Sequence, residues 1–412
     1  MNLSSDNRFV FFDFIFDGKI LKNAPVCGMT LKKCGNMRFR WNEKNELRNA
    51  VLTELSGADG AVANDDAVPG AQDLVNNGSA VSGAETAVAN DDAVPGAENA
   101  VKNGSAVLGA RDFVNNDNAV SGARDFVRNG SAVSGAHANF TQNKVVPVAV
   151  ELIHSKKVID LDDLVQCKNT SGTENKNNDE NFPGGAMEKI SGTLADGIIT
   201  ADKNFMPVVT VADCMPIFLF DKATETFGIV HSGWKGTGIA AEAVALMCKN
   251  HGARPENISV ILGPHIRECC YIVNAERAEY FRTEFTPDCV QELEEGGKCF
   301  AGGRGLPVKW NSGDGKLYSL SLEKANLAVL KKCGIPFENI NVIKECTCCN
   351  QIFGSNRRET AERNALHSPD EKLPAIPPFT VQAAFIRFYC GIRKSIFSKI
   401  SLHGKFVRHL IQ

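Results

Sequence analysis

Residues 206–220 read Met-Pro-Val-Val-Thr-Val-Ala-Asp-Cys-Met-Pro-Ile-Phe-Leu-Phe, two apolar runs separated by a short segment that ends in Cys214. A third apolar run, at 226–231, ends in His231. Short apolar runs rich in Val, Ile and Phe are typical of buried strands. The sequence therefore predicts strands at 206–211, 217–220 and 226–231, and it predicts that the runs 206–211 and 227–230 are neighbours with a thiol and an imidazole at their ends.

Apolar runs elsewhere predict further strands at 8–16, 145–153 and 257–262. Residues with helical periodicity predict helices near 44–55, 238–250 and 320–334. Sheets need a second layer to bury their apolar faces. We therefore predict an α+β fold in which mixed sheets pack together and helices flank them.

The chain has 412 residues and a formal net charge of −3, which gives it no general affinity for nucleic acid or anionic lipid. No apolar run approaches the roughly 18 residues of a membrane-spanning helix. Asp13 and Asp17 interrupt the apolar N-terminus, unlike the continuous core of a signal peptide. The 14 cysteines are scattered, as in cytosolic proteins whose thiols stay reduced. We predict a cytoplasmic protein with no nucleic-acid partner and no transmembrane segment.

A repeat of 13 residues occupies 57–136, where Gly-Ala recurs at 57, 70, 83, 96, 109, 122 and 135. Each unit offers mainly Ala and Val, which bury too little surface to offset the entropy of ordering the backbone. We therefore predict a flexible or partly helical insert with an unknown partner, rather than a packed repeat module. The insert would interrupt a single discontinuous domain formed by 1–56 and 137–367.

Two other segments lie outside this pattern. Residues 168–188 are rich in Asn, Gly, Lys and Glu and are predicted to form a polar surface loop. Residues 368–412 form a basic, apolar C-terminal extension in which 381–411 mixes aromatic residues with Lys and Arg. Either a basic amphipathic helix on a membrane surface or partner, or an accessory helix or extension without such a role, fits that composition.

Three side chains at the ends of predicted strands suit a transition metal. His154 follows the run 145–153, and it joins Cys214 and His231. A structural zinc site uses four protein ligands, whereas a catalytic site uses three and keeps one position open. A thiolate with two imidazoles suits zinc and also copper. The alternative is that these residues bind no metal: the histidines would form ordinary hydrogen bonds, and Cys214 would be a small buried residue of the core.

Other residues near these positions suit binding of an anion and transfer of a proton. Gly233, Trp234, Lys235 and Gly236 form a glycine-rich turn before a predicted helix, where free backbone N–H groups favour an anion such as phosphate. Arg357 and Arg358 could supply guanidinium groups to the same anion or form an ordinary solvated pair. The carboxylates of Asp196 and Asp213 are the candidate proton carriers.

The remaining cysteine groups carry weaker signals. Cys269 and Cys270 are predicted to be packing residues, with a thiol nucleophile as the alternative. Cys346, Cys348 and Cys349 lack the usual zinc spacing, and no second pair follows at the right distance.

Several motifs, taken in order, resemble those of the laccase-domain (YfiH-like) family, which was first described as polyphenol oxidases. They are Leu152-Ile-His-Ser155, Ala195-Asp-Gly-Ile-Ile-Thr200, Ala212-Asp-Cys-Met-Pro216, His231-Ser-Gly-Trp-Lys-Gly236, Gly263-Pro-His-Ile266, Cys269-Cys-Tyr271, Cys346-Thr347 and Ser355-Asn-Arg-Arg358. The sequence departs at Lys235, where the family more often carries Arg. The resemblance implies a fold similar to that of cysteine hydrolases.

The resemblance also implies a zinc-dependent purine nucleoside phosphorylase with adenosine deaminase activity. Its substrates would be phosphate with adenosine, inosine, guanosine or methylthioadenosine, and its products the base and ribose 1-phosphate. Trp234 would stack on the purine or simply pack. Copper-dependent oxidation of phenols fits less well, because a trinuclear copper cluster needs many histidines and the chain has eight.

Two further functions stay open from the residues alone. Cys214, activated by His231, could act as the nucleophile of a cysteine hydrolase or deamidase. The chain could instead be a metal-held binding module that uses its repeats as an interaction arm.

Overall fold

The computed structural model describes residues 1–57, 145–167, 192–293, 316–366 and 379–388. Contacts divide the chain into one unit of residues 1–62 with 141–412 and a second unit of residues 63–140. The predicted repeat insert and the predicted loop at 168–188 lie outside the described residues, so both stay predictions.

Two six-stranded sheets form the centre of the first unit. The first has the order β1 (Asn2–Leu3), β2 (Phe9–Phe12), β5 (Val26–Thr30), β17 (Gln382–Arg387), β9 (Phe205–Val211) and β6 (Val146–Ala149). The second has the order β16 (Ile340–Val342), β12 (Ile258–Leu262), β10 (Met215–Asp221), β11 (Phe227–Ser232), β8 (Gly197–Thr200) and β7 (Val158–Asp160). The pairs β6–β9, β7–β8 and β12–β16 are parallel and the others antiparallel, so both sheets are mixed.

Smaller elements surround these sheets. They are the three-stranded sheet β13 (Ile272–Val273), β15 (Leu317–Leu320) and β14 (Val290–Leu293), the hairpin β3 (Ile15–Phe16) and β4 (Lys19–Ile20), and the helices α1 (Glu46–Leu55), α2 (Leu161–Cys167), α4 (Ile239–His251), α5 (Ala275–Glu284), α6 (Leu322–Lys332) and α7 (Asn356–Leu366). Short 3-10 turns lie at Lys32–Cys34, Pro255–Asn257, Pro287–Cys289 and Phe337–Asn339.

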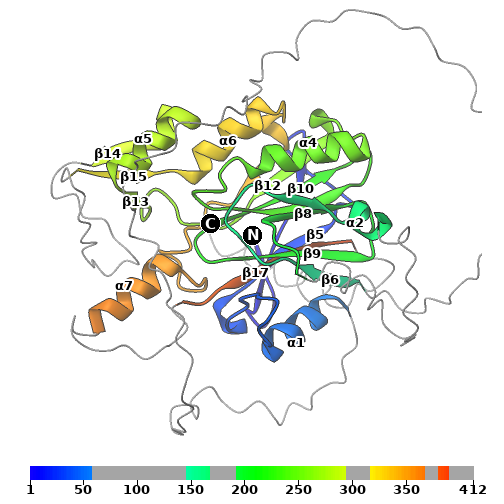
Figure 1. Cartoon of the computed structure of the whole chain (residues 1–412), viewed down its shortest axis with the longest axis horizontal. Helices are drawn as coiled ribbons and strands as arrows, with labels where there is room; N and C mark the ends of the chain where they lie inside the picture. The colour runs from blue at the N-terminus through cyan, green and yellow to red at the C-terminus, as the bar shows by residue number, and fades with distance from the viewer. Residues whose placement is uncertain (58–144, 168–191, 294–315, 367–378, 389–412) are drawn as a thin grey trace, which may run out of the picture. The chain divides into compact units, whose positions relative to one another are not determined.

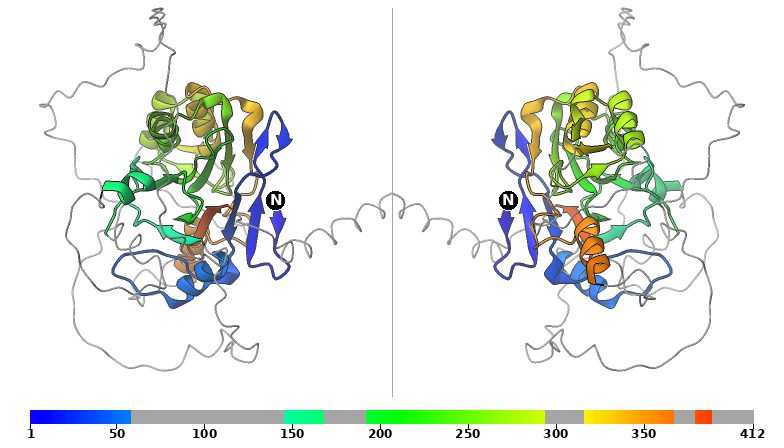
Figure 2. Two further views of the ribbon diagram at one scale, coloured as in Figure 1. Left: turned by 90° about the vertical axis from the view of Figure 1, so that its right-hand side faces the viewer. Right: turned by 90° about the vertical axis from the view of Figure 1, so that its left-hand side faces the viewer.

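The two sheets pack face to face, with helices on their outer faces (Figures 1 and 2). Side chains alternate along β10 because successive residues of a strand point to opposite faces. Ile217 and Leu219 pack in the core that includes α4 and α6. Phe218 faces the first sheet, with its ring centroid 5.8 Å from that of Phe12. Since α1 covers the other face of the first sheet, the predicted α+β architecture is confirmed.

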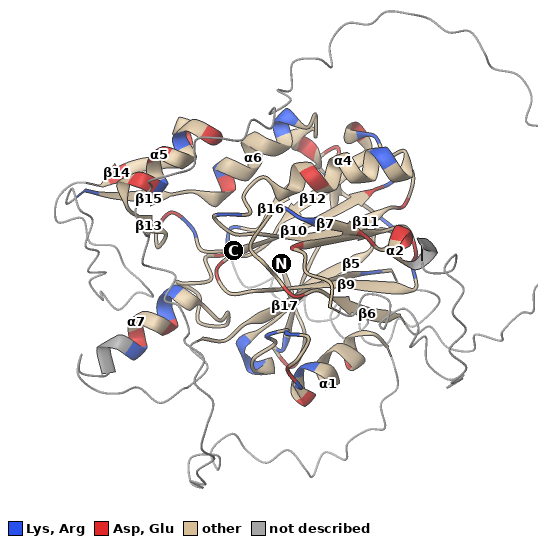
Figure 3. Cartoon of the chain, in the orientation of Figure 1, with Lys and Arg blue, Asp and Glu red and all other residues tan. Residues whose placement is uncertain are grey.

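Local signals account for the helix ends. The side chain of Asn274 accepts a hydrogen bond from the Arg277 N–H at the start of α5, and Ser321 caps α6 in the same way. Helix α4 ends at Gly252, whose φ of 67° is the left-handed conformation that glycine adopts readily. Figure 3 places many of the charged residues on the outer helices and leaves the strands of both sheets largely uncharged.

The C-terminal extension contributes a strand to the middle of the first sheet. β17 pairs with β5 on one side and β9 on the other, and all six of its residues are buried. The helix predicted for 381–411 is therefore wrong over 382–387. Burial on both faces removes the polar alternation by which a strand is recognised in sequence. Residues 389–412 lie outside the described part.

None of the helices in the described ranges is long and apolar enough to cross a membrane. The predicted cytoplasmic location stays a prediction.

Candidate active site

Segments next to strands of both sheets bring the three predicted metal ligands together. Cys214 immediately precedes β10, His231 lies near the end of the neighbouring β11, and His154 follows β6. The rings of His154 and His231 meet edge to face, with centroids 5.2 Å apart. A Cβ atom built at Gly233 would lie 3.0 Å from the Cys214 sulfur and 3.6 Å from Cε1 of His231. The thiol of Cys214 and the imidazoles of His154 and His231 therefore lie close together.

Asp196 holds the backbone that carries His154. Its carboxylate accepts hydrogen bonds from the His154 N–H (2.8 Å), the Ser155 N–H (2.7 Å) and the Ser155 hydroxyl (2.8 Å). His154 has a φ of 56°, which is unfavourable for a residue with a side chain. Asp196 is fully buried, so its hydrogen bonds offset a conformation that the chain would otherwise avoid.

Asp196 also faces the second imidazole. Its Oδ1 lies 3.6 Å from Nδ1 of the buried His231, which is an electrostatic contact rather than a hydrogen bond. Burial would raise the pKa of Asp196, but His231 and the hydrogen bonds from Ser155 hold that pKa below its ordinary value. Burial would lower the pKa of His231, but Cys214 and Asp196 raise it to about 9. Asp196 thus positions both imidazoles.

Both carboxylate oxygens of Asp213 accept hydrogen bonds from other segments. One oxygen accepts from the Thr347 hydroxyl (2.7 Å) and the other from the Arg357 N–H (2.7 Å). Its φ is 77°, and its burial raises its pKa despite these hydrogen bonds. Both oxygens join the start of β10 to the segment around α7. These contacts anchor Asp213 in the structure, and proton transfer by Asp213 stays a prediction.

The glycine-rich turn packs closely against the ligand-bearing segments. A Cβ atom at Gly236 would lie 2.7 Å from the backbone oxygen of Ser155, which is closer than real Cβ atoms approach. The Thr237 hydroxyl donates to the Gly233 carbonyl at 2.8 Å. Helix α4 begins two residues later, after Gly238 with a φ of 98°. These glycines therefore permit close backbone contact beside Cys214 and His154.

Trp234 stands exposed on this turn with cations beside it. Its side chain is 37% exposed. Nζ of Lys235 lies 5.3 Å from the centroid of its ring system, and the guanidinium carbon of Arg277 lies 4.2 Å away, within the range of a cation–π contact. Sequence reasoning missed Arg277, because no motif marks it and only the docking of α5 brings it to the turn.

The two predicted phosphate-binding arginines donate to backbone oxygens instead. Arg358 is buried and donates to the carbonyls of Thr347 (2.8 Å), Cys348 (3.0 Å) and Asn350 (3.3 Å), and also to that of Phe353. Arg357, which is half-buried, donates to the carbonyls of Cys270 at 3.2 Å and Ile272 at 3.3 Å. The predicted guanidinium fork is therefore not assembled at the glycine-rich turn.

Replacing Arg358 should destabilise the protein. Arg358→Met removes the donor from several buried carbonyls, so we expect the free energy of unfolding to fall by about 3 kcal/mol. Arg358→Lys should recover only part of the loss, because an ammonium lacks the fork. Denaturant unfolding measures the stability of both variants. Arg38→Met is the control, because the Arg38 side chain is 44% exposed and lies as far as 3.9 Å from its ion-pair partner Glu43. Equal stability of the Arg358 and Arg38 variants would contradict a stabilising role for the hydrogen bonds of Arg358.

The candidate ligands suit a metal in kind, although their atoms do not fully converge. Nδ1 of His231 is buried without a hydrogen-bond partner in the described part of the chain. The ligand atoms of His154, Cys214 and His231 do not all lie within 4.8 Å of one another, unlike those of Cys269, Cys270, Cys346 and Cys349. Closing the set would need rotation of at least one side chain, and His154 is exposed. A ligating imidazole must be neutral, so a metal would compete with the proton on His231.

The family described as multi-copper polyphenol oxidoreductase laccase matches residues 101–365, which is more than half of the chain. The chain belongs to this family. The match confirms the resemblance drawn from the motifs around His154, Cys214 and His231. The family description names copper, whereas the donor set also suits zinc.

Several curated proteins are similar to this chain. Purine nucleoside phosphorylase YlmD of Geobacillus stearothermophilus is 30% identical over 167 residues, which are 40% of this chain and 55% of that protein. The chain thus spans about half the length of this relative. Adenosine deaminase RL5, from an unknown prokaryotic organism, is 31% identical over 205 residues, 48% of this chain and 71% of that protein.

Two solved structures are also similar to this chain. The crystal structure of YfiH from Bacillus licheniformis is 24% identical, covers 59% of this chain and 74% of its own, and has a TM-score of 0.41. That of YlmD from Geobacillus stearothermophilus has the same identity and coverages and a TM-score of 0.40.

Proposed function

We propose that this laccase-family chain is a purine nucleoside phosphorylase that uses zinc at His154, Cys214 and His231, with adenosine deamination as a second activity. The observation that carries the proposal is the meeting of two imidazoles and a thiol beside a turn that presents an exposed Trp234. The relatives YlmD, a purine nucleoside phosphorylase, and RL5, an adenosine deaminase, support these two activities as proposals for this chain.

Zinc held by these residues would polarise a bound oxygen and lower the pKa of bound water to about 7. The chain's own contribution is to fix the ligands. Asp196 anchors the His154 backbone and faces Nδ1 of His231. The close approach of Gly233 keeps the space beside the Cys214 sulfur small.

The glycine-rich turn supplies candidate contacts for both substrates. In phosphorolysis, a phosphate oxygen bonds to C1′ of the ribose while the C1′–N9 bond breaks, and the base leaves with the electron pair and takes up a proton. Lys235 and Arg277 place two cations near Trp234, and cations of this kind bind phosphate oxygens. The exposed indole can stack on a purine in an offset arrangement. Arg357 and Arg358 have no part in this proposal.

Replacing His231 tests the proposal. We expect the wild-type protein to release adenine from adenosine and hypoxanthine from inosine only with phosphate, and His231→Ala to lower kcat/KM by about 100-fold or more, because second-shell changes alone cost 10- to 100-fold. Chromatography of the bases measures this. His251→Ala is the control: it hydrogen bonds Asp160 at 2.7 Å and lies at the far end of α4, about 20 Å along the helix. Normal turnover by His231→Ala, or base release without phosphate, would contradict the proposal.

The approach of Cys214 to His231 supports one alternative, a cysteine nucleophile paired with a histidine base. A cysteine hydrolase or deamidase would keep its activity after chelation and lose it on alkylation by iodoacetamide. The proposed phosphorylase would lose activity on chelation. Oxygen uptake with a phenol and added copper would instead indicate an oxidase.

A further inference from the structure

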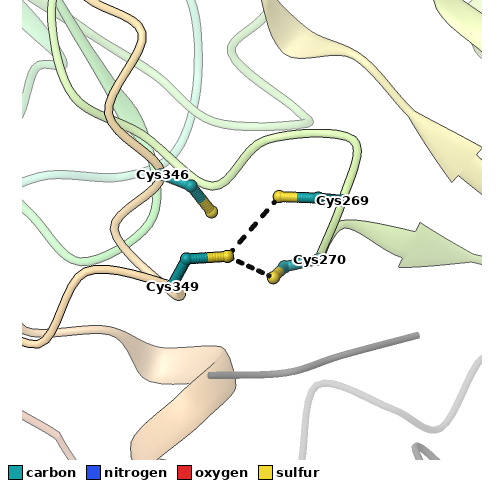
Figure 4. A group of neighbouring side chains, drawn as sticks. All are labelled: Cys269, Cys270, Cys346 and Cys349. Carbon is teal, nitrogen blue, oxygen red and sulfur yellow. Dashed lines mark hydrogen bonds between the residues drawn. The ribbon is translucent and has the colours of Figure 1, made fainter. Parts of the chain in front are cut away.

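A second group of metal-ligating side chains lies apart from the two histidines. The sulfur atoms of Cys269, Cys270, Cys346 and Cys349 all lie within 4.8 Å of one another (Figure 4). The Cys270 and Cys349 sulfurs are 3.3 Å apart, and those of Cys269 and Cys349 are 3.6 Å apart. We call these four residues the thiol cluster.

The spacing within the thiol cluster matches one tetrahedral ion. Zinc binds thiolate sulfur at about 2.3 Å, so the edges of a regular four-sulfur tetrahedron are about 3.8 Å long. The observed separations of 3.3 and 3.6 Å and the 4.8 Å limit bracket that value. A disulfide needs an S–S distance of about 2.05 Å. In an iron–sulfur cluster several atoms separate the thiolates, so four sulfurs this close leave room for a single ion.

Two backbone segments hold the thiol cluster in place. The turn before β13 supplies Cys269 and Cys270, and it is closed by the Cys270 N–H donating to the Arg267 carbonyl at 2.9 Å. The segment before α7 supplies Cys346 and Cys349, and the Asn350 N–H donates to the Cys346 carbonyl at 2.9 Å. An isolated backbone β-bridge between His265 and Cys346 joins the two segments. The four sulfurs are therefore positioned by hydrogen bonds made elsewhere, as ligands of a metal site must be.

A backbone donor faces the thiol cluster, because the Arg267 N–H approaches the Cys346 sulfur at 3.5 Å. Cys270 and Cys346 are buried, whereas Cys269 and Cys349 are exposed, so an ion could enter from the exposed side. The thiolate is the form of cysteine that binds metals.

The spacing of the cysteines in the sequence did not indicate the thiol cluster. Cys346 and Cys349 form a Cys-x-x-Cys pair, and no second pair follows them in the sequence at the right distance. The partners Cys269 and Cys270 precede them, and only the fold brings the pairs together. The prediction that Cys269 and Cys270 are merely packing residues is wrong for the exposed Cys269.

We propose that the thiol cluster binds one zinc ion as a closed, structural site, separate from His154, Cys214 and His231. The ion would fasten the turn before β13 to the segment before α7. That segment also carries Thr347, which donates to Asp213 next to Cys214. The thiol cluster would thus hold in place the backbone that supports the candidate active site.

The test is metal analysis of the full chain, purified in reducing buffer and reconstituted with zinc. We expect two zinc ions per chain, one of which is lost in Cys349→Ser and retained in His231→Ala. Cobalt substitution should give strong sulfur-to-metal charge-transfer absorption that Cys349→Ser weakens. Cys349 is exposed, so the serine replaces no core packing, and Cys269→Ser repeats the test from the other segment. Cys248→Ser is the control, since this half-buried thiol lies in α4.

Three results would overturn the proposal. They are unchanged zinc content in both Cys349→Ser and Cys269→Ser, a disulfide between cluster residues in protein that takes up no zinc, and iron in place of zinc at the cluster. Because the readouts are metal content and absorption, they are independent of the proposed phosphorylase activity. Inactive protein that still loses one zinc in Cys349→Ser would support the thiol cluster and contradict only the proposed function.

Discussion

Deletion of residues 368–412 should abolish cooperative folding of the unit that carries the candidate active site. The deletion removes β17 from between β5 and β9. Both neighbouring strands would lose a ladder of backbone hydrogen bonds in the middle of a sheet. Unpaired, buried backbone groups are costly, so the first sheet would divide into two parts.

The packing lost with β17 adds to that effect. Ala384 and Ile386 lie in the core between the two sheets, and Phe385 faces α1 on the other side. Truncation of a buried Phe alone costs about 3–5 kcal/mol, against a total stability of about 5–15 kcal/mol for a typical domain. Arg387 also donates to the Leu55 carbonyl at the end of α1. The sum of these losses exceeds what a domain of ordinary stability withstands.

A shorter deletion provides the control. Removal of residues 389–412 keeps all six residues of β17 and every strand pair that the structure describes. We expect this variant to unfold cooperatively near the wild-type midpoint in thermal and denaturant experiments followed by circular dichroism. The longer deletion should show no cooperative transition. If both deletions unfold alike, β17 is not an integral strand of the sheet.

The sequence predicts β10, β11 and β12 of the second sheet because their signals are local, but it does not predict β7, β8 or β16. The run 226–231 matches β11 (227–232), and the helix predicted at 238–250 matches α4 (239–251). β17 was missed for a physical reason. It has only six residues, two of them alanines, and lies among basic residues whose composition favours a helix.

The candidate site was predicted in composition rather than in role. Segments next to β6, β10 and β11 bring His154, Cys214 and His231 together, but the runs 206–211 and 227–230, predicted as neighbouring strands, lie in different sheets. The metal-binding role of the three residues stays a prediction. The roles of the acids depend on long-range hydrogen bonds, such as that from Thr347 to Asp213, which joins residues 134 positions apart. The burial of Arg358 could not be predicted either, because nothing in the sequence indicates that this charged side chain is buried and donates to backbone carbonyls.

Asp196→Asn should cause the largest loss of activity of any change outside the three proposed ligands. An asparagine keeps the size of the side chain but replaces one acceptor oxygen with a donor group. The N–H groups of His154 and Ser155 donate to different carboxylate oxygens, so one of them would lose its acceptor, and His231 would lose its facing charge. Replacing a group that orients metal ligands costs about 10- to 100-fold in metal affinity or activity. We expect kcat/KM and zinc affinity at this site each to fall by about 100-fold.

Asp221→Asn separates this positioning role from a loss of stability. Asp221 is also fully buried and accepts from the N–H groups of Ala223 at 2.7 Å and Arg254 at 3.2 Å, but it lies at the opposite end of β10 from Cys214. The two variants should lose similar amounts of stability, because each places an amide against backbone donors. Only Asp196→Asn should weaken zinc binding, and it should spare the ion at the thiol cluster. Equal effects of both variants on zinc affinity would mean that Asp196 acts through stability alone.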